Sequence, residues 1–204
     1  MRAILISGAC VLGLAGCADF DLGSLGGDPE PVQRAALLGG AIDVAGPAGY
    51  CVDIADSRLT RGFALLTSCD TLGLEDVDAP QQAGIITIQA GRSGTAAVAG
   101  SEPALAGFLE SDAGAALLSD DAEGVTILGT TTGDNIVSVA FEDNGGTPFA
   151  GTQDSAWRAF VDIDGRLVTI SARGLAAQPL GNTSGEQLLE AAVAAMLAAN
   201  GTES

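Results

Sequence analysis

The chain has 204 residues, of which 26 are acidic and 8 are basic, so its formal net charge is −18 at pH 7. Every basic residue is an arginine, and there is no lysine and no histidine. The acidic balance excludes nucleic acid as a partner, because affinity for phosphate backbones comes mainly from basic side chains. The missing residue types exclude Ser-His-Asp triads, histidine-ligated zinc sites and lysine Schiff bases.

The first residues predict a secretory leader. A positive charge at Arg2 precedes an uncharged, mostly apolar run over 3–14, which is too short to cross about 30 Å of hydrocarbon as a permanent helix. The run closes with Leu14-Ala15-Gly16-Cys17, which resembles the bacterial lipobox. This resemblance implies a lipoprotein signal peptide over 1–16 and a lipid anchor, such as palmitate-bearing diacylglycerol, on Cys17. A plain secretory signal and an uncleaved anchor are the alternatives.

Residues 17–33 are predicted to form the lipidated N-terminus and a flexible tether, because they are rich in Gly, Asp and Pro and show no helical or strand period. Two or more acyl chains bind a bilayer stably, since each buried CH₂ contributes about 0.8 kcal/mol. We therefore expect a single domain, 34–204, held at a bacterial membrane and facing the periplasm. The aspartate that favours inner-membrane retention in some bacteria comes one place late, at Asp19, which favours the outer membrane.

The cysteines predict one structural disulfide. Cys10 lies in the leader and Cys17 is the expected lipid site, so Cys51 and Cys69 are left to pair in an oxidising compartment. Closing the loop from 51 to 69 would stabilise the fold by about 3 kcal/mol in the chain-entropy model. A redox-active pair is the alternative, but it needs a closely spaced C-x-x-C arrangement, which the sequence lacks.

Short strands separated by Gly, Pro and Asp dominate the first half of the domain, and we expect them at 41–44, 50–54, 63–69 and 85–90. Apolar residues near helical spacing predict a helix over 102–118, which Gly107 and Gly114 weaken and could interrupt. Strands follow at 125–131 and 136–141, joined through Gly133-Asp134.

A β-hairpin is predicted over 156–173, because Asp164-Gly165 suits a tight two-residue turn between two β-rich runs. Such a loop places Val161 opposite Val168, Ala159 opposite Ile170 and Trp157 opposite Ala172, which makes one face wholly apolar. The other face is mixed, with Arg158 opposite Ser171 and Phe160 opposite Thr169.

The chain ends in a predicted amphipathic helix. Ser184 and Gln187 match a capping box, and Asn200-Gly201 supplies the C-terminal break. An apolar stripe suits packing on a sheet; its members are Leu188, Leu189, Ala192, Val193, Met196 and Leu197. The polar face has no Lys or Arg, which disfavours a membrane-surface role. The element order predicts an α+β fold, a mostly antiparallel sheet packed by a mid-chain helix and a C-terminal helix.

The late hairpin, from Trp157-Arg158-Ala159-Phe160 through Arg166-Leu167-Val168-Thr169-Ile170 into the terminal helix, resembles the ending of PsbP/Mog1-like domains. The resemblance covers the last third of the chain. Because that family consists largely of binding and assembly factors, it implies a scaffold more than an activity.

Carboxylate chemistry is the main catalytic option that remains. Asp162, Asp164, Asp120, Asp121 and Glu123 are candidates for a glycosidase-like pair, but few aromatic residues are available to hold a sugar. Turn chemistry also explains the two hairpin aspartates.

Two further patterns have ordinary explanations. Asp162-Ile163-Asp164-Gly165 and Asp143-Asn144-Gly145 echo fragments of calcium loops, and neither continues to the Glu at the twelfth position of an EF-hand. Gly91-Arg92-Ser93-Gly94 lacks the lysine of a phosphate-binding loop and is interpreted as a turn.

The sequence thus predicts a membrane-anchored, non-enzymatic lipoprotein without a cofactor, which binds an envelope protein or supports envelope assembly. A calcium- or small-ligand-binding domain is the first alternative. A carboxylate-dependent hydrolase is the second.

Overall fold

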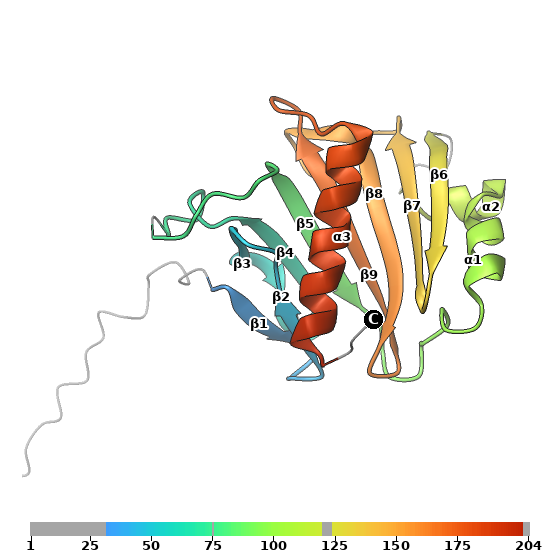
Figure 1. Ribbon diagram of the computed structural model, residues 1–204, viewed down its shortest axis with the longest axis horizontal. Helices are drawn as coiled ribbons and strands as arrows, with labels where there is room; N and C mark the ends of the chain where they lie inside the picture. Colours follow the sequence, from blue (N-terminus) through green and yellow to red (C-terminus); the bar gives the residue numbers. More distant parts are fainter. Residues whose placement is uncertain (1–31, 75, 120–123, 202–204) are drawn as a thin grey trace, which may run out of the picture.

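A computed structural model describes residues 32–74, 76–119 and 124–201. The predicted signal peptide, Cys17 and most of the predicted tether lie outside these residues, as do Asp120, Asp121 and Glu123. The chain folds as an α+β structure, as the sequence predicted (Figure 1). Its elements are, in order, β1 (Arg34–Leu37), β2 (Ile42–Ala45), β3 (Tyr50–Arg58), a 3-10 turn η2 (Leu59–Arg61), β4 (Phe63–Ser68), β5 (Gly84–Ala90), α1 (Glu102–Leu109), α2 (Asp112–Ala115), β6 (Val125–Gly133), β7 (Ile136–Asp143), β8 (Thr152–Ile163), β9 (Arg166–Leu175) and α3 (Asn182–Ala199).

Seven strands form one antiparallel sheet in the order β3-β4-β5-β9-β8-β7-β6. Helix α3 lies across one face of this sheet, and the short helices α1 and α2 lie beside β6 and β7 (Figure 1). Consecutive side chains alternate between the two faces, so each strand contributes one set of residues to the α3 face and one to the opposite face. Among the described residues, helices cover the opposite face only at its β6–β7 end, and side chains of the middle strands such as Gln89 are exposed there.

The β8–β9 hairpin has the register that the sequence predicted. Val161 pairs with Val168, Ala159 with Ile170 and Trp157 with Ala172. The turn residues Asp164 and Gly165 have φ angles of 48° and 69°, which a two-residue primed turn requires. The apolar face of this hairpin carries the main core beneath α3.

Helix α3 buries the predicted apolar stripe against the sheet, and five of its members are buried: Leu188, Leu189, Ala192, Val193 and Met196. The predicted capping box is wrong, because the helix begins at Asn182 with Gly181 as the N-cap. Ser184 lies inside the first turn, where its hydroxyl donates to the carbonyl of Gly181 at 3.0 Å. The predicted C-terminal break is confirmed, since Asn200 caps the helix and Gly201 has a φ of 66°.

The predicted mid-chain helix is interrupted, but not at a glycine. Ser111 separates α1 from α2, and its hydroxyl accepts a hydrogen bond from the backbone N–H of Gly114 as the N-cap of α2. A second apolar cluster lies beneath these helices, around Leu109, Val139 and Phe141. The turn between β6 and β7 is Asp134-Asn135, one residue later than predicted, because Gly133 already pairs with Ile136.

The sequence did not predict β1, which forms a hairpin with β2 that packs under α3. Val32, which precedes β1, forms a bridge to β3 in the main sheet. Its carbonyl accepts a hydrogen bond from the N–H of Val52 at 2.8 Å. Cys51 in β3 and Cys69, just after β4, form the predicted disulfide, with their Cα atoms 4.9 Å apart. This crosslink holds one edge of the sheet.

Candidate functional site

A polar groove lies on the sheet face opposite α3, with a volume of about 720 Å³. We call it the sheet-face groove. Its floor comes from the middle strands and its walls from the end of the α2 segment and the loop after β7. The floor residues are Phe63, Thr87, Gln89, Arg158, Phe160, Thr169, Ser171 and Arg173, and the wall residues are Leu117, Leu118, Ser119, Asp143, Gly145, Gly146, Thr147 and Pro148.

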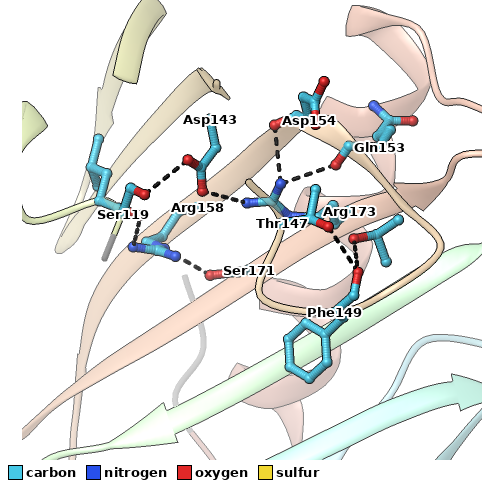
Figure 2. A network of polar contacts seen from close by, with 11 residues as sticks. Ser119, Asp143, Thr147, Phe149, Gln153, Asp154, Arg158, Ser171 and Arg173 are labelled. Atoms are coloured by element: carbon cyan, nitrogen blue, oxygen red, sulfur yellow. Dashed lines mark hydrogen bonds and ion pairs between the residues drawn. The ribbon is translucent and has the colours of Figure 1, made fainter. Parts of the chain in front are cut away.

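A buried ion pair joins the floor of the groove to one wall (Figure 2). Arg173 in β9 lies 3.5 Å from the carboxylate of Asp143, and both side chains are almost fully buried. The guanidinium also donates to the carbonyls of Gln153 and Asp154, each at 3.0 Å. The Ser119 hydroxyl donates to the second oxygen of Asp143 at 2.8 Å.

The ion pair of Arg173 and Asp143 has a structural role, because both charges are buried and paired with each other. We call this pair the clamp. Burial lowers the pKa of Arg173, and the neighbouring charge of Asp143 acts in the opposite direction. An arginine stays protonated in proteins, so the buried cation needs its anionic partner and its two carbonyl acceptors. The clamp thereby fixes the end of β7 against β8 and β9.

Arg158 lies next to this clamp in β8. Its Nε donates to the Ser171 hydroxyl at 2.8 Å, and one terminal nitrogen donates to the carbonyl of Leu118 at 3.2 Å. Its guanidinium also lies over the ring of Phe141, 5.3 Å from the centroid. Arg158 therefore links the sheet to the segment after α2 and positions that wall of the groove.

Hydrogen bonds also stiffen the loop that forms the second wall. The hydroxyls of Thr147 and Thr152 both donate to the carbonyl of Phe149, at 2.9 and 2.7 Å (Figure 2). These two hydrogen bonds fix the conformation of the loop between β7 and β8, which forms this wall of the groove.

The structure gives Asp162 a structural role. Its carboxylate accepts hydrogen bonds from the backbone N–H groups of Ala97, Val98 and Ala99, at 2.8 to 3.0 Å. It therefore fixes the segment that leads from β5 to α1. Asp164 lies in the exposed hairpin turn, so neither aspartate lines the sheet-face groove.

The structure gives different roles to the other residues that the sequence analysis considered as candidates for a site. Asp143 belongs to the buried ion pair, and Gly91-Arg92-Ser93-Gly94 forms the turn that the sequence predicted. Among residues 32–74, 76–119 and 124–201, no three His, Cys, Asp or Glu side chains gather as a metal site. Asp120, Asp121, Glu123 and the lipid site Cys17 lie outside these residues.

Sequence reasoning missed both the groove and the clamp of Arg173 and Asp143. The mixed face of the predicted hairpin was the available signal, because it placed Arg158 and Ser171 side by side on the face opposite α3. The partner of Arg173 is thirty positions away in sequence, and only the pairing of β7 with β8 brings it near. Strand order, which the sequence did not specify, therefore determines the site.

No protein family model and no curated protein matches the sequence. Among solved structures, a mutant of the protein Mog1 is 15% identical with a TM-score of 0.46, covering 81% of this chain and 93% of its own. The Ran-binding protein Mog1p of Saccharomyces cerevisiae is 14% identical with a TM-score of 0.46, covering 81% and 92%. Both carry the Mog1 name that the sequence resemblance suggested, and neither assigns an activity to this chain. Within the described part of the chain, the helices are all too short or too polar to span a bilayer.

Proposed function

We propose that the protein is a non-enzymatic binding protein of the bacterial envelope, anchored by lipid on Cys17, whose sheet-face groove receives a polar segment of a partner protein. The groove is the observation that carries this proposal. It leaves about 720 Å³ of space over a sheet whose other face packs against α3 and the β1–β2 hairpin.

The chemistry of the floor suits a peptide segment. Thr87, Gln89 and Thr169 place hydroxyl and amide groups side by side on neighbouring strands. These side chains both donate and accept hydrogen bonds, so they can pair with the main chain and polar side chains of a bound segment. The clamp of Arg173 and Asp143 lines the same groove and ties its floor to one wall, and such pre-organisation reduces the entropy lost on binding.

Binding is favoured over catalysis because the groove offers no free acid or base among its described lining residues. Its one carboxylate, Asp143, is held by Arg173 and Ser119. A hydroxyl nucleophile such as Ser171 needs a neighbouring base, and Ser171 contacts the permanently charged Arg158 instead.

Site-specific crosslinking in the native envelope tests the groove. A photo-crosslinking residue replaces Gln89, which is exposed in the groove, or Gln187, an exposed glutamine on α3 behind the sheet. We expect one defined protein adduct from position 89 and none from position 187. Thr169→Phe in the same chain fills the groove and should abolish the adduct. Equal capture at the two positions, or capture that survives Thr169→Phe, would contradict the proposal.

The anchor has a separate test. A Cys17→Ser chain should take up no labelled fatty acid and should keep its leader, because the lipoprotein peptidase acts on the lipidated cysteine. Mass spectrometry of the wild-type chain should find an N-terminal acylated Cys17. A normally labelled and processed Cys17→Ser chain would refute the lipid site and leave the groove untouched.

A further inference from the structure

Two neighbouring hollows lie on the α3 side of the sheet, between α3 and the strands at the β6 edge. We call them the helix-side hollows. Their volumes are about 290 and about 230 Å³, and Ser138, Leu189 and Glu190 belong to both. The two hollows adjoin at these shared residues, and we refer to them together as the depression. Helix α3 packs mainly on β2, β8 and β9 rather than on the β6 edge. Leu128 in β6 is accordingly 44% exposed.

The floor of the depression is apolar. In the first hollow it includes Ile136, Val193 and Leu197, and in the second it includes Ala140 and Trp157. Removing apolar surface from water is favourable, so an apolar ligand gains free energy by covering this floor.

Three buried polar atoms of residues that line the hollows lack a partner among the described residues: Trp157 Nε1, Thr130 Oγ1 and Asn135 Oδ1. Trp157 is 1% exposed, and its indole Nε1 makes no hydrogen bond within the described residues. A buried donor left unpaired destabilises the fold, and a bound acceptor would recover part of that free energy. Asn135 lines the first hollow, and its side-chain oxygen is likewise unpaired among the described residues.

The charges around the depression all have one sign. Asp134, Glu186 and Glu190 line the hollows, and the lining residues that the structure describes include no arginine. Three carboxylates around an apolar floor attract a cation and repel a fatty acid or another anion. The lining of the sheet-face groove is different, since it holds two arginines and one aspartate.

We propose that the helix-side hollows bind an apolar small molecule that carries both a cationic amine and a carbonyl oxygen. The apolar part covers the floor beside α3, the carbonyl accepts the hydrogen bond of Trp157 Nε1, and the amine lies near Glu186 and Glu190. This site is on the opposite face of the sheet from the sheet-face groove and does not depend on the function proposed for it.

Octanoylcholine is a suitable probe, because it combines an eight-carbon chain, an ester carbonyl and a quaternary ammonium group. Trp157 is the only tryptophan, so its indole N–H gives a single NMR signal that reports directly on the site. We expect octanoylcholine to shift this signal downfield in a saturable way. Methyl octanoate should bind more weakly, and octanoate should bind weakest because it carries a negative charge. Octanoate binding as tightly as octanoylcholine would overturn the charge argument.

Two variants separate the contributions. Glu190→Gln should weaken octanoylcholine at least threefold, while Glu110→Gln, at the exposed end of α1, should leave the affinity unchanged. Trp157→Phe keeps an aromatic ring and removes the donor. By calorimetry it should bind octanoylcholine two- to tenfold more weakly, as the loss of one neutral hydrogen bond predicts. Unchanged affinity in Trp157→Phe, or no indole shift up to the solubility limit of the probe, would refute the site.

Discussion

Gly185 offers a direct test of how α3 packs on the sheet. An added Cβ at this position would lie 2.3 Å from two carbons of the Trp157 ring. Ordinary carbon–carbon contacts are about 3.5–4.0 Å, so alanine cannot fit unless the helix or the ring moves. The ring is fully buried in the core, which makes such a movement costly. We predict that Gly185→Ala destabilises the protein.

Two opposing effects set the size of this change. Alanine in a helix is favoured over glycine by about 1 kcal/mol. Overpacking a closely packed core typically costs about 1–3 kcal/mol, and the short distances at Gly185 place the cost at the upper end. The expected net loss is therefore about 2 kcal/mol. Gly107 in α1 provides the matched control, because a Cβ there meets nothing within 4 Å. Gly107→Ala should stabilise the protein by about 1 kcal/mol.

Urea unfolding of the purified proteins measures both effects, with helix content as the signal for all three chains. Trp157 emission supplies a second signal, since this is the only tryptophan and it lies at the altered contact. We expect the two variants to differ by about 3 kcal/mol in free energy of unfolding. If Gly185→Ala is as stable as the wild type or more stable, the close packing of α3 against Trp157 is refuted.

Three further predictions concern the groove and the sheet. Asp143→Asn should lower the free energy of unfolding by about 3–5 kcal/mol in denaturant melts, because it leaves Arg173 buried without its counter-ion. The double change Asp143→Leu with Arg173→Met removes both charges and should recover most of that loss. Reducing the Cys51–Cys69 disulfide should cost about 3 kcal/mol, measured by paired melts with and without reductant; an unchanged midpoint would contradict this value. Burial raises the pKa of Tyr50, so its stabilising effect is complete below pH about 10, the unfolded value, and is lost at higher pH. A Tyr50→Phe chain should show less of this alkaline loss, and equal loss would exclude the tyrosine as its cause.

The sequence predicted best those elements whose position and boundaries are determined by neighbouring residues in the chain. Asp164-Gly165 determines both the turn and the register of β8 and β9, because a two-residue loop fixes which residues face each other. Helix α3 has a continuous apolar stripe and a stop at Asn200, so its face and its end could both be located. Its start could not, because glycine at the N-cap, Gly181, leaves no capping side chain to recognise.

The site was harder to predict because it depends on strand order. Arg173 and Asp143 meet only after β7 pairs with β8, and no local pattern in the sequence specifies that pairing. The carboxylate of Asp162 was a reasonable candidate for chemistry until the structure placed three backbone N–H groups around it. The β1 strand was missed because four residues are too few to show a period.

The side chain of Asn200 joins the end of the described chain to its beginning. Its amide donates to the carbonyl of Asp43 and its oxygen accepts from the N–H of the same residue, across 157 positions. A polypeptide emerges from the ribosome N-terminus first. The hairpin that contains Asp43 is therefore made early but gains its cover only when the last helix has been synthesised. The Cys51–Cys69 bond, by contrast, joins β3 to the residue that follows β4, the next strand in sequence. The covalent crosslink at this edge of the sheet is therefore local in sequence, whereas the cover that α3 provides connects opposite ends of the described chain.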